Sequence, residues 1–312
     1  MLIEQTTTYA YKLKYLENPS FDKVRNLAKK FIDELPKELV DGLYSTINRG
    51  VDILKTEPEM LVYLYSLGNM HQAKLNFAFA KIPEDFLQQP EINIIDYGCG
   101  QAIGTMCYAD FLKSKNYNQQ IKSVTLIEPS EICLKRAALH VSVCCPNVNL
   151  STVNKKFDEL SDMDCSYKTD IPTLHILSNV LDLDFDLQKF AKIIYLNLRY
   201  YNQFVCVGPY FYSLKKDRRM NDFANLLRGN IDFSTKLGKG ESTSNVYVPS
   251  GNFAITWDDN LKAYLYIGFY SDGMMVPDGY DNDNRPDGAK LVLNNGRGTI
   301  TWNKTTKTWN RV

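Results

Sequence analysis

The chain has 312 residues, and its hydrophobic content of 44% is ordinary for a globular protein with a buried core. Basic and acidic residues number 36 each, so the net charge draws the chain toward neither nucleic acid nor an anionic membrane, although a local basic patch is still allowed. Seven cysteines without a Cys-x-x-Cys pair, together with three histidines, argue against a disulfide framework and a zinc site, so we expect reduced thiols and no metal centre.

Residues 1–13 have neither the basic start nor the apolar core of a signal peptide, and no stretch reaches the ~18 apolar residues of a membrane span, so we expect a cytoplasmic protein.

Helices are expected over the first ninety residues. Ser20 is placed to cap a helix whose apolar residues recur every three or four positions until Pro36 ends it. A second helical block covers residues 58–82, where Gly68 is a candidate break.

From residue 91 the pattern changes to strands that alternate with helices. The predicted strands cover residues 91–98, 121–130, 147–157, 173–181 and 203–211, and the predicted helices cover residues 105–114, 131–145, 185–201 and 218–229, the last with Gly229 as its C-cap. Parallel strands need crossover helices of this kind. The alternation therefore predicts an α/β fold with a doubly wound, mostly parallel sheet.

Beyond about residue 240 the composition changes again. This tail is rich in Gly, Asn, Asp, Thr and aromatic residues, which predicts short strands joined by polar turns. The segment AITWDDNLKAY (254–264) resembles TITWNKTTKTW (299–309), and this single recurrence indicates a repeated strand pair at most. We therefore divide the chain into a helical region (1–90), an α/β domain (91–240) and a β-rich tail (241–312), part of which can complete the parallel sheet.

The turn after the first strand, IIDYGCGQAIG, carries an acidic residue two positions before its first glycine. Gly98, Gly100 and Gly104 suit a backbone that turns tightly and approaches a ligand closely. Asp96 argues against a pyrophosphate above this turn, because its carboxylate would repel the phosphates, and it favours a ligand with a positive group. A nicotinamide-dependent oxidoreductase is therefore the less favoured reading of this motif.

Residues 91–240 resemble a class I S-adenosylmethionine-dependent methyltransferase. The family's pattern, an apolar strand followed by an acidic residue and Gly-x-Gly-x-Gly, matches IIDYGCGQA at Asp96, Gly98 and Gly100, and Ala102 stands in place of the third glycine. The resemblance implies a Rossmann-like fold with S-adenosylmethionine as the cofactor. It also implies that Asp96 binds the methionine ammonium, directly or through water, and that the backbone at Gly98, Gly100 and Ala102 lies against the cofactor.

The resemblance extends to the ends of three further strands. Glu128 matches the acidic residue that holds both ribose hydroxyls, and either Asp158 or Asn154 is placed near the adenine. Ser178 and Asn179 occupy the end of the fourth strand, beside the sulfonium. Asn179 is the one candidate for a catalytic residue, but the Pro-Pro-aromatic sequence of enzymes that methylate amino groups of nucleic acids does not follow it.

Candidates for the acceptor side lie before and after these strands. His71 and Lys74, on the helix ahead of the first strand, are placed to contact the methionine carboxylate or the substrate, with region 1–90 as a substrate cap. The basic residues that follow the fifth strand allow, without requiring, nucleic acid as a partner: Lys215, Lys216, Arg218 and Arg219.

The expected function is transfer of a methyl group from S-adenosylmethionine to an acceptor, which stays open among RNA, protein and a small molecule. The alternative is a non-catalytic binding protein built on a methyltransferase scaffold, with the β-rich tail as its working part.

Overall fold

The computed structural model describes most of the chain up to residue 208 and a smaller part beyond it. The described residues are 4, 7–47, 50–80, 82–165, 171–198 and 201–208, the helical positions 219, 222, 223, 226 and 227, residue 305, and the backbone of the strands between residues 252 and 311. The predicted C-cap Gly229 lies outside the described residues.

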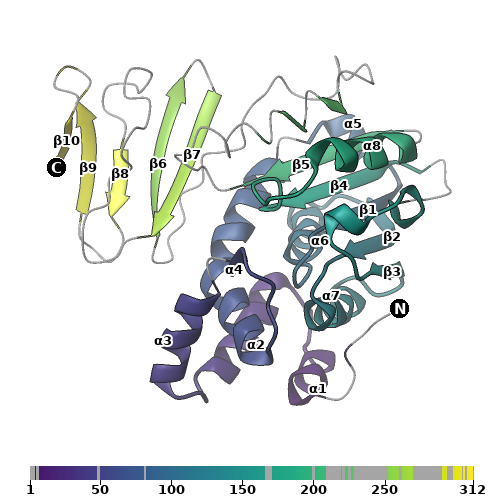
Figure 1. The fold of residues 1–312 in the computed structure, drawn as a ribbon, viewed down its shortest axis with the longest axis horizontal. Helices are drawn as coiled ribbons and strands as arrows, with labels where there is room; N and C mark the ends of the chain where they lie inside the picture. Colours follow the sequence, from purple (N-terminus) through teal and green to yellow (C-terminus); the bar gives the residue numbers. More distant parts are fainter. Residues whose placement is uncertain are drawn as a thin grey trace.

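A parallel sheet of five strands has the order β3-β2-β1-β4-β5 (Figure 1). The strands are β1 (Glu91–Tyr97), β2 (Gln120–Ile127), β3 (Asn149–Val153), β4 (Thr173–Ser178) and β5 (Asn202–Val207). The crossovers contain α6 (Ile103–Lys115), α7 (Glu131–Cys144), the 3-10 helices η2 (Phe157–Glu159) and η3 (Asp162–Cys165), and α8 (Leu187–Asn197). The predicted α/β fold with a doubly wound parallel sheet is thereby confirmed.

Both faces of this sheet are buried, because successive side chains of a strand point to opposite sides. On β1, Ile92 and Ile94 belong to a core that also contains apolar residues of α4, α6 and α7. Ile95 and Tyr97 belong to a second core, which contains the apolar face of α8. Near-continuous burial along β1 thus explains why its sequence reads as an apolar run rather than as an alternation.

Helices precede the sheet, as the sequence predicts. They are α1 (Thr8–Lys14), α2 (Phe21–Ile32), α3 (Lys37–Thr46), α4 (Glu57–Phe79) and α5 (Glu84–Leu87). The predicted cap of α2 is confirmed, because the Ser20 hydroxyl accepts a hydrogen bond from the Lys23 N–H at 3.3 Å. The long helix α4 packs against α2, α3 and α6 and connects these helices to the sheet (Figure 1).

Gly68 does not interrupt α4, which runs without a break from Glu57 to Phe79. A Cβ atom built at Gly68 would lie 2.9 Å from the Cζ atom of Phe21 and 3.5 Å from the Cδ atom of Arg25. The glycine therefore makes room for α2 to pack closely against α4. Its role is in helix packing, which the sequence pattern of a single helix does not reveal.

The tail forms a second, antiparallel sheet in the order β10-β9-β8-β6-β7. Its strands are β6 (Asn252–Asp259), β7 (Lys262–Phe269), β8 (Lys290–Leu293), β9 (Gly298–Asn303) and β10 (Thr308–Arg311). The two similar segments form two hairpins of the same register, with Trp257 opposite Tyr264 and Trp302 opposite Trp309. Among the described strands, those of the tail pair with one another and not with β5. The proposed domain limits stay a prediction.

All seven cysteines of the chain fall within the described residues, and each has a free thiol. Six are buried and Cys206 is partly exposed. Within the part of the chain that the structure describes, no helix combines the length and the apolar character needed to cross a bilayer.

Candidate functional site

The candidate site lies at the carboxyl ends of β1, β2 and β4, where the strand order reverses between β1 and β4. Crevices at such a reversal are the usual ligand sites of doubly wound sheets. The loop from β1 to α6, residues 98–102, which we call the glycine loop, has three residues with left-handed backbones: Gly98 (φ 58°), Gly100 (φ 52°) and Ala102 (φ 62°).

The two glycines of this loop differ in their surroundings. A Cβ atom at Gly98 would lie 2.5 Å from the Cγ1 atom of Val180 and 3.2 Å from the ring of Phe157, so this glycine admits the loop that follows β4. A Cβ atom at Gly100 would meet nothing within 4 Å. Gly100, rather than Gly98, therefore borders open space in which a ligand would lie against the backbone.

Ala102 takes a backbone conformation that favours glycine. Its side chain is fully buried, and it precedes α6 in a left-handed conformation that costs an L-residue about 1–2 kcal/mol. At this position it is therefore the backbone angle, and not space for a ligand, that favours glycine in this chain.

Asp96, near the end of β1, is 1% exposed. Its Oδ2 atom accepts hydrogen bonds from the backbone N–H of Thr105 at 3.1 Å and from the Thr105 hydroxyl at 2.8 Å. Burial raises the pKa of Asp96 to about 7, and the bonds from Thr105 oppose this shift. The carboxyl group is thus fixed against the first turn of α6, beside the glycine loop.

Glu128 follows β2 and is 8% exposed. Its Oε2 atom accepts from the Gly100 N–H at 3.0 Å, and its Oε1 atom accepts from the Ser130 N–H at 2.9 Å. Burial raises its pKa to about 7, these two bonds oppose the shift, and the charge of Asp96 adds to it. Two carboxyl groups from neighbouring strands therefore face the same loop.

The two candidates for the adenine side are held by local contacts. Asn154 donates from Nδ2 to the carbonyl oxygens of Glu128 at 2.9 Å and Pro129 at 3.0 Å. Asp158 is exposed, and its Oδ1 atom accepts from the N–H of Asp186, the N-cap residue of α8, at 2.9 Å. Asn154 is therefore bound to the segment that carries Glu128, whereas Asp158 supports the start of α8.

The end of β4 is joined to α4 by a chain of polar side chains. Asn179 has a left-handed backbone (φ 58°), and its Nδ2 atom donates to His71 Nδ1 at 2.6 Å and to the Ser178 hydroxyl at 3.0 Å. Its Oδ1 atom accepts a hydrogen bond from the amine of Lys74. The structure thus brings together four residues that the sequence suggested separately for the cofactor and acceptor sides.

The direction of these hydrogen bonds fixes the form of the histidine. Because Nδ1 of His71 accepts from the amide of Asn179, its Nε2 atom carries the proton and donates to the Tyr63 hydroxyl at 3.1 Å. Burial and the neighbouring Lys74 lower the pKa of His71 well below its usual value. Burial lowers the pKa of Lys74 to about 7, although the charge of Asp182 opposes this shift.

Sequence reasoning missed Thr105 as a part of this site, and it suggested Tyr63 only as an aromatic side chain of the acceptor pocket or the core, without its contact to His71. Thr105 follows the glycine loop in a predicted helix, and its contact with Asp96 is detectable only once β1 and α6 are packed. Tyr63 lies eight positions before His71 on α4, which places both on one face of a helix, and that spacing was the available signal.

The basic residues after β5 fall mostly outside the described residues, which include only Arg219 among them. Arg219 donates from Nε to the carbonyl oxygen of Leu181 at 2.8 Å and from Nη2 to that of Phe185 at 3.0 Å. Its contacts are therefore with the loop that follows β4, and nucleic acid as a partner stays a prediction. In the described part of the chain, no group of three or more His, Cys, Asp or Glu residues suits a metal ion.

No protein-family model matches the chain, and no curated protein matches its sequence. Among solved structures the chain is similar to the carbon methyltransferase DszA, with 15% identity over 56% of this chain and 38% of that one and a TM-score of 0.29.

Two further structures come from proteins proposed to be S-adenosylmethionine-dependent methyltransferases. For the protein of Methanococcus maripaludis, identity is 13% over 67% of this chain and 91% of that one, with a TM-score of 0.33. For the class I protein of Listeria monocytogenes, identity is 11% over 84% of this chain and 72% of that one, with a TM-score of 0.35. The chain thus spans little more than a third of DszA and most of the other two proteins.

The fold is evident from the sheet itself. Five parallel strands follow the order β3-β2-β1-β4-β5, a glycine loop leads from β1 into α6, and helices cover both faces. This doubly wound α/β arrangement fits the fold of the class I S-adenosylmethionine-dependent methyltransferases.

Proposed function

We propose that this protein binds S-adenosylmethionine at the carboxyl ends of β1, β2 and β4 and transfers its methyl group to an acceptor. The observation that carries the proposal is the pair of buried carboxyl groups next to the glycine loop, Glu128 bonded to Gly100 of the loop and Asp96 bonded to Thr105 just after it, where the loop borders open space at Gly100. Carboxylates here would repel the pyrophosphate of a dinucleotide. They suit a ligand that offers an ammonium and ribose hydroxyls.

The chain's own residues fit that ligand. Glu128, held beside the loop by two N–H groups, is the acceptor for ribose hydroxyls. Asp96 supplies negative charge near the loop for the methionine ammonium, and this charge is favoured once a cation is present, because a neighbouring positive group lowers a carboxyl pKa. Gly100 leaves the backbone free of a Cβ atom where the ligand would pass.

The bound cofactor would supply a sulfonium-activated methyl group, so the protein needs chiefly to align an acceptor with it. The chain from Lys74 through Asn179 to His71 and Tyr63 lies at the end of β4 and offers donors and acceptors for that alignment. Asn179 is the candidate for contact with the reacting atoms. The acceptor itself stays open among RNA, protein and a small molecule.

Calorimetric titration with S-adenosylhomocysteine tests this proposal. We expect micromolar binding by the natural protein and its loss in Asp96→Ala and Glu128→Ala. Glu91→Ala is the matched control, since this carboxylate lies at the opposite end of β1, and it is expected to bind normally. A protein that binds NAD but not S-adenosylhomocysteine would contradict the assignment, and binding that survives both site substitutions would place the ligand elsewhere.

A further inference from the structure

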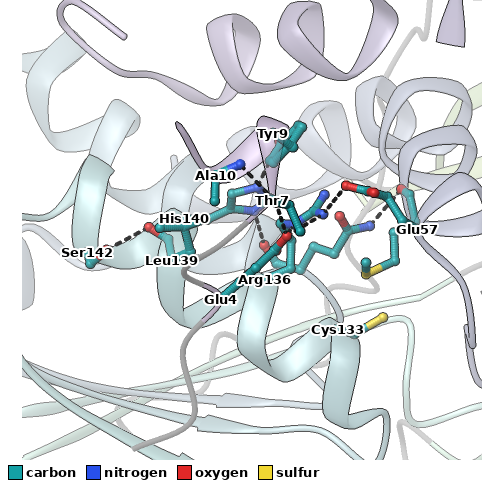
Figure 2. Close-up of polar contacts among 12 residues, drawn as sticks. Glu4, Thr7, Tyr9, Ala10, Glu57, Cys133, Arg136, Leu139, His140 and Ser142 are labelled. Carbon is teal, nitrogen blue, oxygen red and sulfur yellow. Dashed lines mark hydrogen bonds and ion pairs between the residues drawn. The ribbon is translucent and has the colours of Figure 1, made fainter. Parts of the chain in front are cut away.

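Behind the glycine loop, a buried network connects the start of the chain to α7 (Figure 2). Arg136 of α7 is fully buried, and its guanidinium group contacts the carboxylate of Glu4 through Nε and Nη2 and that of Glu57, the first residue of α4, at 2.7 Å. Its Cζ atom lies 3.9 Å from the centre of the Tyr9 ring. Figure 2 shows Arg136 between Glu4 and Glu57.

Opposite charges contact one another in this network, which holds Glu4 against α7. Burial disfavours ionisation of Glu4, but the hydrogen bonds and charge of Arg136 hold its pKa below the usual value. A buried guanidinium group left without its carboxylates would be strongly destabilising. The N–H of Glu4 also donates to the carbonyl oxygen of Lys135 at 3.1 Å, so backbone and side chain both attach this residue to α7.

His140 connects α1 to the glycine loop through two hydrogen bonds. The Tyr9 hydroxyl lies 3.0 Å from His140 Nε2, and His140 Nδ1 lies 2.8 Å from the carbonyl oxygen of Gln101. Burial lowers the pKa of His140 to about 3, so the ring is neutral near pH 7. A carbonyl oxygen only accepts, so Nδ1 carries the proton, and Nε2 must then accept from the Tyr9 hydroxyl.

Gln101 is the residue of the glycine loop that His140 binds. Its backbone carbonyl receives the bond from His140, and its side-chain Nε2 donates to the carbonyl oxygen of Met60 at 2.8 Å. The next residue is Ala102, whose left-handed backbone is unfavourable for an L-residue and must be held by its surroundings. The bond from His140 holds the peptide group immediately before it.

We propose that the N-terminal arm, defined as Glu4 and α1, is a positioning element for the glycine loop. The Gln101 carbonyl fixes the tautomer of His140, and the Tyr9 hydroxyl, by donating to Nε2, holds the ring where Nδ1 reaches Gln101 and keeps the loop in the shape that the ligand requires. The inference rests on the proposed function for the identity of the ligand. The effect on the His140 ring and on the loop follows from the contacts alone.

The other histidines make this tautomer directly observable. His71 accepts at Nδ1 from Asn179, and His175 lies 3.0 Å from the Oδ1 atom of Asn202 through Nε2, to which it must donate. Of the three histidines in the chain, His140 alone therefore carries its proton on Nδ1. Nitrogen-15 spectra of the imidazole rings distinguish the two forms.

The test compares Tyr9→Phe with the natural protein and with Tyr11→Phe. Phenylalanine keeps the ring over Arg136 and removes only the hydroxyl, while Tyr11 is an exposed tyrosine of the same helix. In Tyr9→Phe we expect a shift of the His140 Nε2 signal, because this nitrogen loses its hydrogen bond, and faster hydrogen exchange at Cys99 and Ala102, whose N–H groups are bonded within or beside the loop. Affinity for S-adenosylhomocysteine is expected to fall about tenfold, as for the loss of one buried hydrogen bond. Tyr11→Phe is expected to match the natural protein in all three measurements.

The outcomes separate this inference from the proposed function. An unchanged His140 spectrum with unchanged loop exchange in Tyr9→Phe overturns the inference, whatever the ligand. Exchange that rises equally in β1 and α6 overturns it too, because the substitution would then have lowered only overall stability. If the natural protein does not bind S-adenosylhomocysteine, the proposed function fails, while the His140 spectrum and the exchange rates still decide the role of Tyr9.

Discussion

Ala102 has a left-handed backbone conformation that usually favours glycine. The effect of its methyl group on stability can therefore be predicted. Removing its methyl group in Ala102→Gly relieves about 1–2 kcal/mol of backbone strain but adds up to about 1 kcal/mol of entropy to the unfolded chain. We expect a net gain of about 0.5–1 kcal/mol in the free energy of unfolding, measured with urea. Ala109→Gly, within α6, is the control and is expected to lose about 1 kcal/mol. Equal losses in both variants would show that Ala102 is not strained.

Asp96 gives a prediction for the dependence of stability on pH. Its pKa in the folded protein is about 7, above that of an unfolded aspartate, so the folded state binds the extra proton. The stability that this group contributes is fully present below about pH 4 and is lost as the pH rises through about 7. The free energy of unfolding of Asp96→Asn, relative to that of the natural protein, is therefore expected to rise by about 2–4 kcal/mol from pH 4 to pH 8.

Urea unfolding at a series of pH values measures this difference. Asp41→Asn, which removes a carboxylate from the exposed side of α3, serves as the control for the loss of one surface charge. A difference between Asp96→Asn and the natural protein that stays constant with pH would show that Asp96 is ionised throughout, as it would be beside a permanent positive group.

At the scale of elements, the packing of α2 on α4 depends on one glycine. Gly68→Ala gains helix propensity, but the added methyl group would lie 2.9 Å from Phe21, a fully buried residue in α2. We expect a net loss of about 1–2 kcal/mol in the free energy of unfolding. Gly42→Ala, in α3, meets nothing within 4 Å and is expected to gain about 0.5–1 kcal/mol. Urea denaturation of both variants measures the contrast, and a gain at both positions would mean that α2 moves to accept the methyl group.

The helices also show what a sequence pattern can and cannot predict. The start of α2 at Ser20 was predictable, because capping and helical spacing are local properties. The continuity of α4 was not, because the space that requires Gly68 is created by another helix. Glycine has low helix propensity on its own, and only its neighbours in space reveal whether it ends a helix or admits a partner.

At the scale of the whole molecule, the α/β fold has cores of its own. The residues of both described cores end at Leu227, and the described strands of the tail pair only with one another. A chain that ends at residue 240 is therefore expected to bind S-adenosylhomocysteine with unchanged affinity and to unfold with a similar thermal midpoint. A chain that ends at residue 200 lacks β5, which borders β4, and is expected to lose both properties. Loss of binding in the longer truncation would give the tail a part in the site.

The site was predictable where it follows one strand and its turn. Asp96, the glycines and Glu128 were proposed because an acidic residue at a strand end next to a glycine turn is a pattern in sequence, and the structure brings them together. The contact between His71 and Asn179 joins residues 108 positions apart, and no local pattern encodes it. The two residues were proposed for separate reasons, and only the path of α4 across the fold brings them into contact. Asp158, in contrast, is bonded to the start of α8, and its place near the adenine stays a prediction.

Cys99 makes the opening of the glycine loop measurable by chemical labelling. The thiol of Cys99 is 6% exposed, and burial and nearby carboxylates raise its pKa well above the usual value, so a closed loop protects it from alkylating reagents. Its rate of alkylation therefore depends on how often the loop opens. A cofactor that keeps the loop closed would lower this rate, and the decrease would measure occupancy of the cofactor site without any knowledge of the methyl acceptor.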